Sequence, residues 1–264
     1  MSIDNQITVL IPTSPIPSHS LCGNTTVIMD QTLAGIRHHL PQAKIIVMMD
    51  GVRPQIEFRR ESYEWYKKEI RQKAAQGQYG DIEFMEHTYY TQQARMTREA
   101  LNKVTTPLIY FSEHDTPLVI DQNPRDGVQE TLSEDLQIGW EEIFQILNSG
   151  QVNQVRFSSW ETLVPEHEYL MRGQLDNHPK FLKTVQYSQW PNVATKGFYE
   201  RILREHFHAH SIQMIEIPMY TAVVRAPWEN FKVCLYYPRP NARRFYHLEG
   251  RIDRHSGQKD ATDW

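Results

Sequence analysis

Short apolar runs alternate with helix-like segments through the first 120 residues, and this alternation limits the fold more than any other feature. The four runs are residues 7–11, 44–49, 82–85 and 107–111. The helix-like segments between them are residues 24–39, 56–76 and 91–104. Runs that are apolar on both faces and are joined by helices predict a mainly parallel sheet with helices on both sides. The expected fold class is therefore α/β.

The second half of the chain has a less regular pattern. Amphipathic spacing predicts helices at residues 134–148 and 197–207. Shorter apolar stretches predict strands at residues 154–157, 214–217 and 221–224. From Cys234 onward Pro, Arg and aromatic residues are frequent without periodicity. We expect this last part to be an ordered tail that lies over a functional site.

Composition narrows the classes of protein that need to be considered. The 264 residues, 40% of them hydrophobic, can build one sizeable core. A net charge of -4 argues against a general nucleic-acid binder. No apolar run approaches the roughly 20 residues of a membrane span, and the polar first residues do not resemble a signal peptide. Cys22 and Cys234 stand in no metal or disulfide pattern, so the expected location is the cytoplasm.

Polar residues follow three of the predicted strands at the point where each strand ends. They are Thr13, Asp50 and the triplet Glu113-His114-Asp115. In open α/β sheets, ligands bind beyond the carboxyl ends of the parallel strands. The sequence therefore predicts a ligand site built from these strand ends.

The acidic triplet suggests a site for Mn²⁺ or Mg²⁺. Glu113 and Asp115 are two residues apart, so in an extended chain their side chains point to the same side, with His114 facing the other way. Two converging carboxylates are hard oxygen ligands of the kind that these cations prefer. A bound cation would bridge a diphosphate. The alternative is a polar turn before Pro117, and the position of the triplet after a buried strand favours the metal site.

Other residues near the strand ends have two interpretations each. Asp50 accepts hydrogen bonds from a base or ribose, or it forms an ordinary Asp-Gly turn. Pro12 and Thr13 hold the nucleotide, or they belong to a loop without a ligand. Arg95 lies three residues before Arg98 on one helix face and either faces a diphosphate or pairs with surface acids.

These pieces together resemble a known family. Residues 7–13, 45–50, 94–95 and 109–115 look like the nucleotide-binding half of the inverting, family-two-like GT-A glycosyltransferases. The resemblance implies a GT-A-like sheet, with residues 1–120 as the nucleotide-sugar half and residues 121–264 as the acceptor half of one continuous domain. The family's Asp-x-Asp metal motif falls on residues 113–115, where Glu113 replaces the first Asp. Its base-contacting aspartate falls on Asp50, and His114 would lie beside the nucleotide.

In the second half, the resemblance implies a catalytic base and an acceptor site. The base is expected after the strand at 154–157, where Glu161, Glu166 and Glu168 are candidates. We favour Glu161 because its neighbour Trp160 could stack on a sugar and raise the carboxyl pKa by desolvation. Trp190 is either a second sugar platform or a core residue.

The tail could complete the site. His247 could supply the further metal ligand that many GT-A enzymes take from their C-terminal region. Arg243, Arg244 and Arg251 could hold the diphosphate, because guanidinium groups match phosphate in bidentate fashion. The alternative is a solvated basic tail. His206, His208 and His210 are better explained as polar residues at a helix end than as a metal cluster.

The predicted function is metal-dependent transfer from a UDP-, GDP- or dTDP-sugar to a hydroxyl of a glycan or lipid-linked acceptor, with inversion implied by the resemblance. One alternative is a sugar-phosphate nucleotidyltransferase. Residues 12–23 contain one Gly and no Lys or Arg, which counts against a triphosphate-binding loop. Another alternative is a non-catalytic module that binds carbohydrate or a protein partner.

Overall fold

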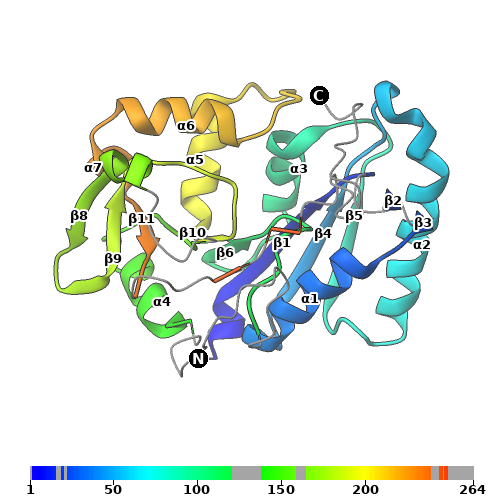
Figure 1. Cartoon of the computed structure of the whole chain (residues 1–264), viewed down its shortest axis with the longest axis horizontal. Coiled ribbons are helices and arrows are strands. Elements are labelled where there is room, and N and C mark those ends of the chain that lie inside the picture. Colours follow the sequence, from blue (N-terminus) through cyan, green and yellow to red (C-terminus); the bar gives the residue numbers. More distant parts are fainter. Residues whose placement is uncertain are drawn as a thin grey trace.

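A nine-stranded sheet runs through the protein in the order β5-β4-β1-β6-β10-β7-β11-β9-β8. The computed structural model describes residues 2–15, 19–20, 23–120, 138–158, 165–238, 244–245 and 247–248. In Figure 1 the helices α1 and α2 lie toward one end of the sheet, and the β8–β9 hairpin lies at the other end.

The N-terminal half, residues 2–120, supplies four parallel strands in the order β5-β4-β1-β6. They are β1 (Ile7–Thr13), β4 (Lys44–Met49), β5 (Ile82–Glu86) and β6 (Leu108–Phe111). Two of these strands, β1 and β6, are buried along their whole length. Such strands need helices on both faces, because neither face tolerates water. A short ribbon of β2 (His19–Ser20) and β3 (Gly23–Asn24) lies outside this sheet.

Helices cover both faces of the sheet, and the helices on each face pack into their own apolar core. The first core includes residues of α1 (Val27–His39), α2 (Arg60–Ala75) and α4 (Trp140–Asn148). The second includes residues of α3 (Gln92–Leu101), α5 (Lys196–His206) and α6 (Glu216–Arg225). Along β1, Val9 and Ile11 enter the first core and Leu10 enters the second, as the alternation of a strand requires.

The C-terminal half, residues 138–248, continues the sheet with mixed strand directions. Strand β10 (Asn192–Thr195) runs antiparallel between β6 and β7 (Gln154–Arg156). Beyond them lie β11 (Val233–Tyr236), β9 (His178–Thr184) and β8 (Met171–Leu175). Short helical turns complete the described elements: η1 (Ile3–Gln6), η2 (Pro54–Arg59), η4 (Pro165–Leu170) and α7 (Trp228–Phe231).

The structure confirms the expected α/β sheet and corrects part of the second half. The strands expected at residues 214–217 and 221–224 are wrong, because this segment forms α6. Ile215, Met219 and Val223 are spaced by four residues and bury one face of that helix. The tail does not begin at Cys234, which lies inside β11. The helix expected from residue 134 begins at Trp140 within the described part, and residues 134–137 lie outside it.

Candidate functional site

The triplet Glu113-His114-Asp115 follows β6 at the carboxyl end of the parallel strands. It forms a turn rather than an extended strand end: Thr116 donates to the Glu113 carbonyl from both its N–H (3.3 Å) and its hydroxyl (2.9 Å). The expected reason for convergence, strand alternation, is therefore wrong. The two acids still influence each other. Burial raises the pKa of Glu113 most, the charges of Asp115 and Glu216 raise it further, and the result is about 8.

Asp115 is the best-connected acid of the triplet. Its Oδ2 lies 3.5 Å from Nε2 of His247 and 4.0 Å from Nε2 of His114. Burial alone would raise the pKa of Asp115, but the two imidazoles outweigh burial and lower it to about 2. Its other oxygen, Oδ1, is buried and has no hydrogen-bond partner among the residues that the structure describes.

The described part of the tail lies over this strand end, as expected. The Leu248 N–H donates to the Asp115 carbonyl (2.9 Å), and the Val119 N–H donates to the Arg244 carbonyl (3.0 Å). Phe245 pairs with Leu118 in an isolated β-bridge. These backbone contacts bring the imidazole of His247 next to Asp115, although 132 residues separate them in the chain.

His114 does not face away from the acids. Its Nδ1 lies 3.2 Å from the carbonyl oxygen of Pro12, and its own carbonyl accepts the Thr32 hydroxyl (2.7 Å). The imidazole therefore reaches across the end of β1 and remains within 4.0 Å of Asp115. Pro12 meets the site through its backbone carbonyl.

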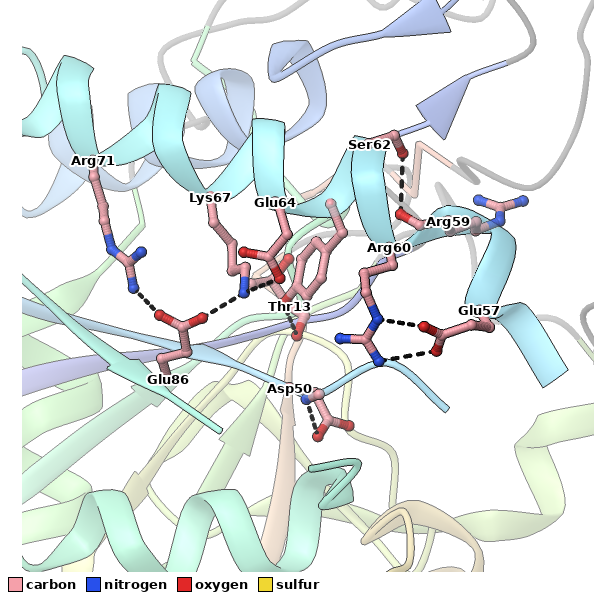
Figure 2. Close-up of polar contacts among 12 residues, drawn as sticks. Thr13, Asp50, Glu57, Arg59, Arg60, Ser62, Glu64, Lys67, Arg71 and Glu86 are labelled. Atoms are coloured by element: carbon pink, nitrogen blue, oxygen red, sulfur yellow. Dashed lines mark hydrogen bonds and ion pairs between the residues drawn. The ribbon is translucent and has the colours of Figure 1, made fainter. Parts of the chain in front are cut away.

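Thr13 and Asp50 lie at neighbouring strand ends, and both are tied into the protein (Figure 2). The Thr13 hydroxyl lies 3.2 Å from the Tyr66 hydroxyl. The Asp50 carboxylate accepts the N–H groups of Gly51 (2.8 Å), Thr91 (2.7 Å) and Gln92 (3.1 Å). Burial raises the pKa of Asp50 despite these three donors. These contacts give Asp50 a structural role at the start of α3, and its contact with a base stays a prediction.

The charged residues above these strand ends mostly pair with one another. Arg60 pairs with Glu57, and Glu86 pairs with both Lys67 and Arg71 (Figure 2). The side chain of Lys67 is only 7% exposed. The charge run of α2 is therefore not wholly solvated, because Lys67 reaches Glu86 on β5.

Two residues that the sequence did not single out belong to the site. The Gln93 amide donates from Nε2 to Oε1 of Glu113 (2.7 Å). Glu216, the first residue of α6, is close enough for its charge to raise the pKa of Glu113. Interpreting residues 214–217 as a strand concealed Glu216, whereas the four-residue apolar spacing after it could have revealed a helix start.

Glu216 also acts on a buried cation at the end of β7. Arg156 is 3% exposed, and its Nη1 donates to the Gln186 carbonyl (3.0 Å). Burial lowers the pKa of Arg156 to about 10, while Glu216 and Tyr187 act in the opposite direction. Asn192 pairs with both Phe111 and Arg156, so the end of β7 is level with the end of β6. The charge of Glu216 therefore acts both on the triplet and on the end of β7.

Several expected ligand residues lie elsewhere. Arg244 is 1% exposed and packs over the ring of Tyr236. Arg95 is paired with Glu99 (2.9 Å) on the surface. Arg98 donates to backbone carbonyls at the end of α5, away from the triplet. The diphosphate role of Arg244 stays a prediction, and the surface interpretation of Arg95 is favoured.

The remaining predicted residues divide into two groups. Trp190 is half-buried against the tail, with its ring centroid 5.5 Å from that of Phe245 and 6.3 Å from that of His247. Trp190 therefore lies beside the site and also packs against the first core. The other residues lie outside the described part of the chain: Trp160, Glu161, Arg243 and Arg251. Their roles stay predictions, as does that of Glu166.

Comparison with solved structures shows that the chain has a GT-A-like fold. A mannosyltransferase, PcManGT from Pyrobaculum calidifontis in complex with GDP-Man and Mn²⁺, is 12% identical with a TM-score of 0.51, covering 87% of this chain and 56% of its own. Residues 1–349 of S. aureus TarS are 9% identical with a TM-score of 0.52, covering 92% and 60%. The chain thus spans little more than half of either protein.

The same fold also occurs in a protein of another class. A UDP-glucose pyrophosphorylase complexed with UDP-glucose is 11% identical with a TM-score of 0.50, covering 91% of this chain and 92% of its own. No protein-family model and no curated protein matches the sequence. At such identities the similarity establishes the fold, and function has to be argued from the site. No described helix is long and apolar enough to cross a bilayer.

Proposed function

We propose that this protein transfers a sugar from a nucleotide-sugar donor to a hydroxyl of a glycan or lipid-linked acceptor, with the help of Mn²⁺ or Mg²⁺. The observation that carries the proposal is the position of His247 next to Asp115, beside Glu113, at the carboxyl end of β6. The GT-A-like neighbours support a nucleotide-sugar donor, since one holds GDP-Man and another is complexed with UDP-glucose.

The donor atoms at this strand end fit a divalent cation in kind. Asp115, Glu113 and His247 would hold it, and the buried Oδ1 of Asp115 is an acceptor without a described partner. Among the described residues, no three His, Cys, Asp or Glu side chains lie close enough together to hold a metal ion by themselves. Diphosphate oxygens and water would therefore have to complete the coordination. When bound, the cation supplies positive charge that offsets the charge growing on the leaving diphosphate.

Inverting transfer also needs a carboxylate that takes the proton of the acceptor hydroxyl. We propose Glu216 as one candidate because it lies at the N-terminus of α6, where the helix dipole favours a carboxylate. Its charge acts on both Glu113 and the buried Arg156. Glu161, the candidate from the sequence, lies outside the described residues and remains the other candidate.

A nucleotidyltransferase is the main competing function, because a pyrophosphorylase shares the fold. Such an enzyme must bind a triphosphate, and the loop of residues 12–23 carries no Lys or Arg to do so. The site therefore favours the glycosyltransferase.

Calorimetry with UDP and GDP, each with and without Mn²⁺, tests the proposal. We expect one nucleotide to bind, and to bind at least tenfold more tightly with Mn²⁺. Hydrolysis of a panel of UDP-, GDP- and dTDP-sugars then identifies the donor. The absence of heat with either nucleotide would contradict the donor assignment and leave a non-catalytic carbohydrate- or partner-binding module. Release of pyrophosphate from a nucleoside triphosphate and a sugar phosphate would favour the nucleotidyltransferase.

A further inference from the structure

Gln93 connects the two halves of the candidate site through a single amide. Its Nε2 donates to Oε1 of Glu113 (2.7 Å), and its Oε1 accepts the N–H of Ile215 (3.4 Å). Ile215 immediately precedes Glu216 at the start of α6. Gln93 is 6% exposed, so water cannot readily replace either hydrogen bond. Only one orientation of the amide satisfies both contacts, because the donor must face the carboxylate.

The backbone on either side of Gln93 is fixed. Gln92 has φ of 63°, a left-handed conformation that is uncommon for a residue other than glycine. The carboxylate of Asp50 accepts its N–H (3.1 Å) and that of Thr91 (2.7 Å). On the other side, the Ala94 N–H donates to the Gln213 carbonyl (3.0 Å). Strained backbone held by several contacts is typical of residues that orient a functional group.

We propose that Gln93 is a positioning residue that couples the carboxylate of Glu113 to the start of α6, and through it to Glu216. The inference rests on the proposed function, because it treats Glu113 as a metal ligand. A cation held by Glu113 fixes that carboxylate, the carboxylate fixes the amide, and the amide holds the Ile215 N–H. Binding on the N-terminal side of the site thereby orders the acceptor side.

The expected loss of metal affinity follows from the behaviour of residues that orient metal ligands in other proteins. Replacing a residue that orients a metal ligand typically lowers metal affinity about 10–100-fold. Gln93→Met removes both hydrogen bonds while keeping an unbranched side chain of similar length. The matched control is Gln92→Met, one residue earlier, where the amide contacts the Tyr90 hydroxyl and not the triplet. Gln93→Leu repeats the test with another side-chain shape, in case one variant folds poorly.

Two measurements on the full chain separate coupling from a merely structural role. Titration with Mn²⁺ alone, followed by electron paramagnetic resonance, reports the metal side. Hydrogen–deuterium exchange of the peptide that contains Ile215, with and without Mn²⁺, reports the α6 side. We expect Gln93→Met to bind Mn²⁺ about tenfold more weakly than Gln92→Met. We also expect Mn²⁺ to slow exchange at Ile215 in the wild type and in Gln92→Met, but not in Gln93→Met.

Each result has a distinct meaning. Equal Mn²⁺ affinity in the two variants, within twofold, would overturn the proposal while leaving the enzyme assignment intact. Weaker binding with exchange protection still present would also overturn it, since Gln93 would then serve Glu113 alone. A wild-type protein that binds no Mn²⁺ even with nucleotide present would overturn the metal-dependent function itself. Melting temperatures of the variants show whether each remains folded.

Discussion

The N-terminal and C-terminal halves of the sheet bury different chemistry. In the N-terminal half, the buried polar residues in the strands and just after them are small or acidic: Asp50 and Ser112 follow strands, and Thr8 and Thr13 lie in β1. In the C-terminal half, the terminal residues of β7 and β10, Gln154, Arg156 and Asn192, are larger polar residues that are 0–3% exposed. Buried polar groups within a strand require partners and constrain what packs above them. The N-terminal half is thus a largely apolar platform with a polar edge, and the C-terminal half carries larger buried polar side chains at its strand ends.

This difference predicts that substitutions in the two halves should impair different steps of the proposed reaction. Changes at the edge of the N-terminal platform should remove donor and metal binding without unfolding the protein. Changes at Glu216 should spare binding and remove transfer. Contacts at Gln93 and in the tail join the two halves, so the separation should be sharp only where these contacts remain.

The largest effect is expected for Asp115→Ala. This change removes the acid that lies 3.5 Å from His247, and with it the proposed metal site. We expect Mn²⁺-dependent nucleotide binding to fall at least ~100-fold, in line with the loss of a direct ligand exceeding that of an outer partner. Calorimetry measures the affinity, and circular dichroism checks the fold. An unchanged Mn²⁺ requirement in this variant would show that the site has been placed wrongly.

The next largest effect separates two candidate bases. Glu216→Gln keeps the shape of the side chain but cannot accept a proton, so kcat for transfer should fall about 100-fold or more. Nucleotide affinity should stay within threefold, because the proposed donor site lies in the N-terminal half. Glu161→Gln is the parallel variant. If it alone abolishes transfer, Glu161 is the base and the role proposed for Glu216 is wrong.

The sequence predicted the N-terminal half well for a physical reason. Three of its four parallel strands, β1, β4 and β6, are mainly apolar and buried. Helices separate these runs along the chain, so the apolar pattern and the chain order both predict the same sheet. The C-terminal half lacks this agreement. Strand β8 is largely exposed, β9 is only partly buried, and β10 has only four residues, so no apolar run marks them. The apolar residues of α6 were mistaken for strands because several of them are β-branched.

The parts of the candidate site that lie at strand ends could be predicted from the order of strands in the sequence. The triplet lies at the expected strand end, and the tail does bring His247 to Asp115. The contacts of Gln93 and the burial of Arg244 could not be predicted, because both depend on contacts that form only in the folded chain. The Gln93 amide meets Ile215, which is 122 residues away. Arg244 packs against Tyr236 and is 1% exposed, which its place in a basic, aromatic segment does not indicate.

A moderate effect on stability is expected for Gly51→Ala. A Cβ at this position would lie 2.3 Å from the Tyr89 carbonyl carbon and 2.6 Å from the Tyr90 nitrogen. These are backbone atoms, so the loop before Thr91 must move, and the contacts of Asp50 with Thr91 and Gln92 move with it. We expect a loss of about 2 kcal/mol in the free energy of unfolding.

The control for that variant lies in the other half. A Cβ at Gly197, at the start of α5, meets no atom within 4 Å. Gly197→Ala should therefore leave stability unchanged or raise it by up to about 1 kcal/mol, as helix propensity predicts. Denaturant unfolding of both variants measures the difference. Equal stabilities would mean that the Gly51 loop is looser than its close packing against Tyr89 indicates.

The smallest effect is expected for Arg95→Ala, which tests whether the edge of the platform extends onto α3. The guanidinium is paired with Glu99 one helical turn away, and the side chain is 41% exposed. An exposed pair of this kind contributes less than about 0.5 kcal/mol to stability. Because Arg95 is turned toward Glu99, nucleotide affinity should change less than twofold. A tenfold loss would instead restore Arg95 as a diphosphate ligand and require its side chain to turn toward Glu113 when the donor binds.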